Sequence, residues 1–168
     1  MLEDSLPLPP GPLLGIDFGT VRIGLALSDR NQTIAAPFQL YERKTVAEDA
    51  AYFQKLVQQE KVVGIVLGLP VHLSGDESKK SKQVKEFANW LRKHLSVPIA
   101  FCDERFTSVF AWDQLKADGL KASQRRKQLD KVAAQMILQH YLDEQKSPHY
   151  ELPRGAEGEG EVMREQHD

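Results

Sequence analysis

Asp17 is the residue of this chain whose position most strongly suggests chemistry. It stands between Ile16 and Phe18 in an apolar, strand-like stretch. Because side chains alternate faces along a strand, Asp17 points away from these two and shares its face with Gly15 and Gly19. A carboxylate on a face with no other side chains predicts room for a bound metal and a phosphate. The alternative is that Asp17 caps the turn that follows.

A second acidic group, Asp103 and Glu104, directly follows the apolar run VPIAFC. In open α/β sheets, ligand sites gather at the carboxyl ends of strands, where this pair is expected to lie. Alternatively, the two acids cap a helix that begins near Thr107, because acidic residues favour helix starts.

The third acidic residue is Asp130, in the helical pattern QLDKVAAQMILQHYL. At 100° per residue it shares one narrow stripe with Ala133, Ala134, Ile137 and Tyr141. Asp130 is therefore expected on the helix face that packs on the sheet, although it could be an ordinary first-turn acid.

Three separate elements thus send an acid toward one place. Two like charges ~4 Å apart repel by about 4 kcal/mol at an effective dielectric constant near 20, so such a cluster needs protons or cations. Ligands that are all oxygen favour hard divalent ions, which predicts Mg²⁺ or Mn²⁺.

The order of elements predicts how these acids are positioned. Three closely spaced strand patterns, separated by turn signals at Gly19-Thr20 and at residues 29–31, predict an antiparallel meander. Alternating helices and buried strands follow, which predicts parallel pairing. We expect an α/β fold, a five-stranded mixed sheet with helices on both faces. The expected strands cover 13–19, 21–29, 33–41, 62–70 and 97–103, and the expected helices 45–60, 78–95, 107–118 and 124–143.

Composition fits one soluble domain, with 168 residues, 41% hydrophobic and 27% charged. The single cysteine, Cys102, excludes an intramolecular disulfide and favours a reduced, cytoplasmic setting. No apolar run reaches the ~18 residues of a membrane span, and the start of the chain does not resemble a secretory signal. We expect a disordered lead (1–12), a folded domain (13–146) and an acidic, glycine-rich, disordered tail (147–168).

Cationic and polar side chains near the acids predict contacts with nucleic-acid phosphates. Basic residues gather at 79–85, at the start of an expected helix, and at 121–131, on the approach to Asp130, and the alternative for each run is a solvated helix face. The candidates for substrate binding are Arg22 and Arg105 beside the acids, His72 in a loop, Thr107 and Ser108 at a helix start, and Arg125 and Arg126 on the approach to Asp130. Trp90 and Trp112 are expected in the core.

Four stretches in this order, GIDFGTVRIGLALSD, VVGIVLGLPVHLSGDES, FCDERFTSVFA and LDKVAAQMILQHYLD, resemble the motifs of the YqgF/RuvX family over roughly residues 13–143. The resemblance implies a ribonuclease-H-like fold and a metal-dependent nuclease. It also implies catalytic, metal-binding roles for Asp17, Glu104 and Asp130, with Asp103 as a neighbouring candidate. Two ions would then activate water and stabilise the leaving oxygen of a phosphodiester, with Asp17 bridging both.

The same resemblance implies maturation of the 5′ end of the small-subunit (16S) ribosomal RNA precursor, with ribosomal particles as partners, by a monomer or a homodimer. One alternative is a Holliday-junction resolvase that acts on branched DNA as a dimer. Another is a catalytically silent nucleic-acid-binding module. A third, an actin-like ATPase, would need a second phosphate loop, which the sequence lacks. Val21, Phe110 and residues 71–74 depart from the family pattern at expected substrate contacts.

Overall fold

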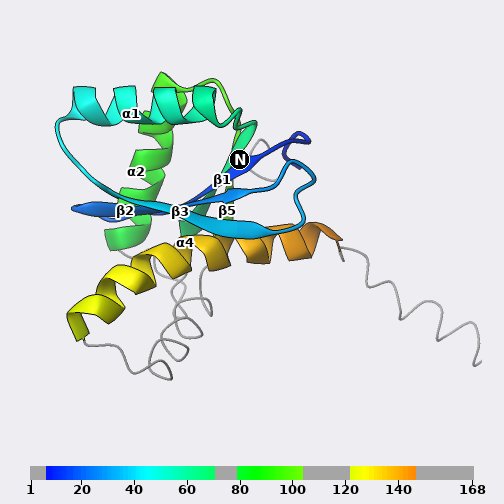
Figure 1. Ribbon diagram of the computed structural model, residues 1–168. Helices are drawn as coiled ribbons and strands as arrows, with labels where there is room; N and C mark the ends of the chain where they lie inside the picture. The colour runs from blue at the N-terminus through cyan, green and yellow to red at the C-terminus, as the bar shows by residue number, and fades with distance from the viewer. Residues whose placement is uncertain (1–6, 71–78, 104–121, 147–168) are drawn as a thin grey trace, which may run out of the picture.

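A single mixed sheet of five strands forms the centre of the protein (Figure 1). The computed structural model describes residues 7–70, 79–103 and 122–146, and over 122–131 it gives the side chain of Gln124 alone. The strands lie in the order β3-β2-β1-β4-β5. Their bounds are β1 Leu13–Asp17, β2 Arg22–Ser28, β3 Ala35–Glu42, β4 Gly64–Leu69 and β5 Ile99–Asp103.

The directions of the strands match the prediction. β2 is antiparallel to both β1 and β3, whereas β4 is parallel to both β1 and β5. The expected α/β fold is therefore confirmed, with the three antiparallel strands and then parallel strands implied by the ribonuclease-H-like resemblance. β4 is buried along nearly its whole length, because a parallel strand inside such a sheet is covered on both faces.

Helices cover both faces of the sheet, as predicted (Figure 1). α1 (Val46–Gln59) and α2 (Lys79–His94) lie on one face and α4 (Ala122–Lys146) on the other. The core is accordingly divided into two apolar clusters. Leu14, Ile16 and Phe53 belong to the cluster under α1 and α2, whereas Leu13 and Ile137 belong to the cluster under α4.

Local sequence signals set the starts and turns. The Thr45 hydroxyl caps α1 by accepting a hydrogen bond from the Glu48 backbone N–H at 3.1 Å. In the turn between β2 and β3, the Asp29 carboxylate accepts hydrogen bonds from the Thr33 backbone N–H, the Thr33 hydroxyl and the Ile34 N–H. The bond from the Thr33 hydroxyl, followed by that from Ile34, lowers the pKa of Asp29 to about 2.

α4 is fixed to the sheet edge by two side-chain amides as well as by apolar packing. The Gln139 side-chain carbonyl accepts a hydrogen bond from the Ala35 N–H at 2.8 Å, and the Gln135 amide donates to the Ala35 carbonyl at 3.1 Å. Cys102 is buried and donates to the Ile137 carbonyl at 3.5 Å, in keeping with the expected structural thiol. α4 contacts all five strands, so among the described helices it is the one that covers this face of the sheet.

The prediction of a disordered lead through residue 12 is wrong for its last part. Leu8 packs against the cluster under α4, and its N–H donates to the Tyr141 hydroxyl at 3.4 Å. The Gln32 side-chain amide donates to the Pro9 and Gly11 carbonyls, and the Pro12 carbonyl accepts from the Val63 N–H. These long-range contacts explain why the segment is held before β1 begins.

Three predictions lie outside the described residues: the helix over 107–118, the place of Trp112 in the core, and the disordered tail over 147–168. Trp90 is partly buried against the cluster under α1 and α2. Of the helices in the described ranges, none combines the length and apolar character needed to cross a bilayer.

Candidate active site

Asp17 is the last residue of β1 and is partly buried. Leu13 belongs to the cluster under α4, whereas Leu14, Ile16 and Phe18 belong to the cluster under α1 and α2. The alternation of the strand therefore places Asp17 on the α4 side, at the carboxyl end of the strand at the centre of the sheet. This is the position that the sequence predicted.

α4 lies close against β1 at Gly15. A Cβ atom at Gly15 would lie 2.7 Å from the Leu138 Cβ and 3.1 Å from the Ala134 carbonyl oxygen. The space beside Gly15 is therefore filled by the helix. The sequence-based explanation, that Gly15 leaves room for a metal beside Asp17, is wrong. Gly19 also has a structural role, because a Cβ there would lie 2.1 Å from the Arg22 carbonyl oxygen inside the turn.

The direction of α4 places Asp130 near the same end of β1. Tyr141 contacts Leu8 before β1 begins, and Ala134 lies over Gly15. Residue numbers therefore fall along α4 as they rise along β1. The turn that precedes Ala134, which contains Asp130, lies toward the Asp17 end of the strand. The predicted stripe is confirmed where side chains are described, since Ala133, Ala134, Ile137 and Tyr141 are buried.

Asp103 ends β5 on the opposite face of the sheet from Asp17. Cys102 belongs to the cluster under α4, whereas Phe101 packs against the other cluster, so alternation turns Asp103 toward α1 and α2. β4 lies between β1 and β5, so the two strands are roughly 10 Å apart. Asp17 and Asp103 share one edge of the sheet, but they do not share a face.

The remaining predicted site residues are described in part or not at all. Arg22 begins β2, is partly buried, and lies opposite Glu42 of β3. Arg125, Arg126 and Asp130 have a described backbone within α4 but no described side chain. Those outside the described residues are Glu104, His72, Arg105, Thr107 and Ser108.

The described residues alone do not complete a metal site. In the ranges for which side chains are given, no three His, Cys, Asp or Glu residues are grouped so that they could hold an ion. Of the three acids that the resemblance implies, the structure gives the side chain of Asp17 only. All three offer carboxylate oxygens, the donors that Mg²⁺ and Mn²⁺ prefer.

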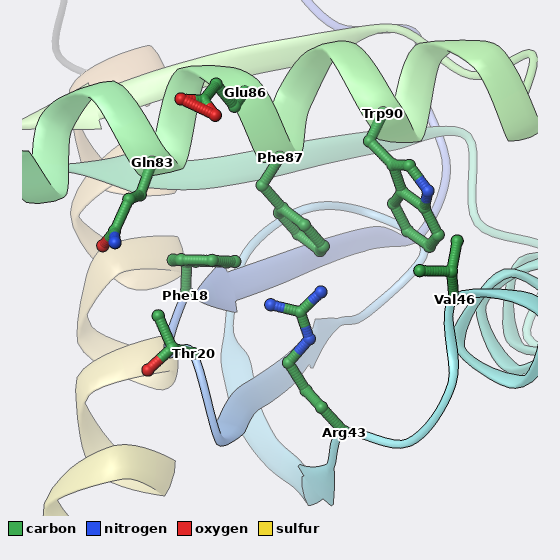
Figure 2. Close-up of a pocket in the computed structure, with 8 residues that line it drawn as sticks. All are labelled: Phe18, Thr20, Arg43, Val46, Gln83, Glu86, Phe87 and Trp90. Carbon is green, nitrogen blue, oxygen red and sulfur yellow. The ribbon is translucent and has the colours of Figure 1, made fainter.

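A cavity of about 290 Å³ opens beside the turn after Asp17, on the side of α1 and α2 (Figure 2). Sequence reasoning assigned it no function, because its residues come from three separate segments. The turn after β1, the segment from the end of β3 to the first residue of α1, and one stripe of α2 contribute Phe18, Thr20, Arg43, Val46, Gln83, Glu86, Phe87 and Trp90.

Arg43 is held at the centre of this cavity by a buried carboxylate. Its Nε lies 3.3 Å from Asp49, which also accepts hydrogen bonds from the Tyr41 hydroxyl at 2.7 Å and the Lys44 N–H at 2.9 Å. Burial raises the pKa of Asp49, but the bonds from Tyr41, Lys44 and Arg43 outweigh it, so the pKa lies below its ordinary value. Asp49 is therefore a charged anchor for the guanidinium.

Solved structures similar to this chain include two Holliday-junction resolvases. Thermus thermophilus RuvC in complex with a Holliday junction substrate is 14% identical, with 82% of this chain and 96% of that chain covered and a TM-score of 0.49. The yeast mitochondrial Holliday junction resolvase Ydc2 is 13% identical, with 89% and 85% covered and a TM-score of 0.48.

Comparison of sequences gives closer relatives. A protein of Rhodopirellula baltica named "Putative pre-16S rRNA nuclease" is 38% identical over 141 residues, which cover 84% of this chain and 81% of that protein. A protein of the same name from Maridesulfovibrio salexigens is 42% identical over 132 residues, which cover 77% and 96%. Residues 11–144 match the sequence profile of RuvX, described as a Holliday junction resolvase. This chain therefore belongs to the RuvX family.

Proposed function

We propose that this protein is a divalent-metal-dependent nuclease that hydrolyses phosphodiester bonds at the Asp17 edge of the sheet. Asp17, Glu104 and Asp130 would hold Mg²⁺ or Mn²⁺, two ions in the full site. The observation that carries the proposal is the close packing of α4 against Gly15, because this packing places the helical turn that contains Asp130 toward the end of β1. The backbone of α4 thus brings a second acid of the sequence, Asp130, toward the end of β1 that carries Asp17.

The acids can act together only with cations between them. When bound, the ions would activate a water molecule and stabilise the leaving oxygen. Asp17 is fixed by the strand, and α4 is fixed by apolar packing and by the bonds from Gln135 and Gln139, so both elements are rigid. Glu104 directly follows Asp103 and so begins within ~4 Å of it along the chain. We assign the ligand role to Glu104 and not to Asp103, which faces the other side.

For the substrate, we propose the precursor of 16S ribosomal RNA at its 5′ end, in the cytoplasm. The names of the relatives at 38% and 42% identity support this choice. A branched DNA is the second candidate, because the family as a whole is described as a Holliday junction resolvase.

Cations around the site support a nucleic-acid substrate. Arg22 lies at the turn that follows Asp17, and the first turns of α2 carry exposed Lys79, Lys80, Lys82 and Lys85. Such side chains bind phosphates without reading sequence. We propose the same role for Arg125 and Arg126 on α4, and substrate contacts for His72, Arg105, Thr107 and Ser108.

The test is a comparison of Asp17→Asn with Asp103→Asn. The two changes are the same in chemistry and lie at the same edge, but on opposite faces of the sheet. Each purified variant is incubated with a 16S precursor RNA and with a four-way DNA junction, in Mg²⁺, in Mn²⁺ and in EDTA. We expect metal-dependent cleavage by the wild type, loss of at least a hundredfold in Asp17→Asn, and near wild-type rates in Asp103→Asn.

The two substrates decide between the two candidate functions. Cleavage of the RNA alone supports the maturation role, and cleavage of the junction alone supports resolution. Equal activity of Asp17→Asn and the wild type would refute the assignment of the site. If the wild type binds the substrates in a salt-sensitive manner but cleaves neither, the protein is a catalytically silent nucleic-acid-binding module and not a nuclease.

A further inference from the structure

We propose that the cavity around Arg43 binds one unpaired base of the nucleic-acid strand whose phosphate lies at the Asp17 edge. This inference rests on the proposed function, because the base is taken to belong to the nucleic-acid strand that is cleaved. It adds a base-binding site on the face of the sheet that α1 and α2 cover, opposite the face of Asp17. The cavity is about 290 Å³, just below the ~300–1,000 Å³ typical of small-molecule sites. That volume suits a single base better than a larger ligand.

The walls of the cavity are planar groups. Trp90 and Arg43 are partly exposed and can stack on a base, whereas Phe18 and Phe87 are buried and support them from the core. Trp90 and Phe87 lie in a stacked pair with ring centroids 5.6 Å apart. The Arg43 guanidinium lies over the Phe18 ring at 5.4 Å and over the Phe87 ring at 5.7 Å. Unpaired bases in protein complexes stack on aromatic rings and on guanidinium planes, and both surfaces are present here.

Polar groups at the rim can bind the edge of a base. In Figure 2, Gln83 points from α2 toward Thr20 across the mouth, and the terminal nitrogens of Arg43 point toward the rings. The ion pair with Asp49 uses Nε, so Arg43 is oriented without using its terminal nitrogens. Glu86 points away from the guanidinium in the same view, so Asp49 is the carboxylate that pairs with Arg43.

The charges beside the cavity fit the phosphates that flank a base. Lys79 and Lys82 are exposed and lie one helical turn before Gln83 and Glu86, so they continue the stripe of α2 that lines the cavity. They are placed for backbone phosphates that leave the cavity on that side.

The distance along the chain fits one continuous strand. Thr20 lines the cavity and is three residues after Asp17, so its Cα lies within about 11 Å of that of Asp17. Stacked nucleotides advance ~3.4 Å per nucleotide along one strand, so the bound base belongs within about three nucleotides of the cleaved bond. A strand that crosses the sheet edge can therefore contact both sites.

The experiment measures binding without cleavage, in EDTA. Single-stranded oligoribonucleotides carry the fluorescent base 2-aminopurine at one position at a time, and matched oligonucleotides are abasic at that position. We expect one position whose emission falls on binding to the wild type. Trp90→Leu should abolish that fall and weaken binding about tenfold, in line with the loss of one stacked base. Both proteins should bind the abasic oligonucleotide equally.

Two further variants serve as a control and as a second probe of the cavity. Phe38→Leu removes a partly exposed aromatic ring from β3, away from the cavity, and should bind like the wild type. Gln83→Ala changes only the rim of the cavity and tests the site if Trp90→Leu unfolds. The proposal is overturned if Trp90→Leu and Gln83→Ala both bind base-containing oligonucleotides like the wild type, or if their losses are the same with abasic ones.

Failure of this proposal can be distinguished from failure of the proposed nuclease function. If Asp17→Asn loses cleavage but Trp90→Leu binds base-containing oligonucleotides like the wild type, the base-binding role of the cavity is refuted and the active-site assignment stands. If Trp90→Leu loses base-dependent binding but the wild type shows no metal-dependent cleavage, the base-binding role stands and the nuclease function is refuted. A parallel series of DNA oligonucleotides shows whether the cavity prefers ribose.

Discussion

Replacement of Gly15 by alanine tests whether cleavage depends on the close packing of α4 against β1. The added Cβ would lie 2.7 Å from the Leu138 Cβ, whereas carbon atoms in contact prefer ~3.5–4.0 Å. The nearest atoms, a Cβ and a backbone carbonyl, cannot rotate away, so α4 as a whole has to move by roughly 1 Å.

Two effects of different size follow from that movement. Overpacking of this kind typically costs about 1–3 kcal/mol, which in a domain of this size lowers the melting temperature by roughly 2–12 °C. A displacement of about 1 Å at a catalytic group can reduce the rate by ~10²-fold. We therefore expect Gly15→Ala to fold, with reduced stability, and to lose about a hundredfold in cleavage rate per folded molecule.

Gly64→Ala provides the matched control. A Cβ there would lie 3.2 Å from terminal methyl groups of Leu13 and Leu8, which can rotate, and Gly64 begins β4 far from the Asp17 edge. The assays are urea unfolding and single-turnover cleavage at a temperature where all proteins are folded. The reasoning is refuted if Gly15→Ala cleaves at the rate of Gly64→Ala, or if Gly15→Ala is as stable as the wild type.

Two further predictions concern binding and stability. Joint replacement of Arg125 and Arg126 by alanine should weaken nucleic-acid binding and reduce the slope of log K against log salt by about 2, because each phosphate contact contributes ~0.9. Titrations of affinity against salt measure it, and an unchanged slope would remove this part of α4 from the substrate path. Asp29→Ala should lower the melting temperature at pH 7. The folded-state pKa of Asp29 is about 2 against an ordinary 3.8, so its contribution is complete above pH ~4 and is lost toward pH 2. Thermal unfolding of both proteins across this range should show the gap narrowing as the pH falls, and a constant gap would contradict it.

The sequence predicted the sheet well because its signals are local. The Asp29 turn, the Thr45 cap and the unbroken apolar run of β4 each depend on neighbouring residues, and the structure places each within a residue or two of the expected position. That Asp17 faces away from Ile16 and Phe18 followed from alternation alone, and the structure adds that α4 covers this face.

What the sequence could not predict depends on which elements meet in space. The reason for Gly15 is the approach of a helix some 120 residues later in the chain, and alternation cannot show that approach. Asp103 and Asp17 follow strands that end at one edge, but their opposite faces appear only from the register of β1, β4 and β5. The cavity around Arg43 was missed because no single stretch of sequence contains its walls.

The contacts of α4 have a consequence for the order in which the protein is made. The five described strands are complete at Asp103, whereas α4, which packs on one of their faces, ends about 40 residues later. At ~5–20 residues per second, the ribosome takes about 2–8 s over that interval, during which Leu13, Val66 and Cys102 lack the packing that α4 provides. α4 also carries Asp130, so the proposed catalytic edge is incomplete until this helix has been made.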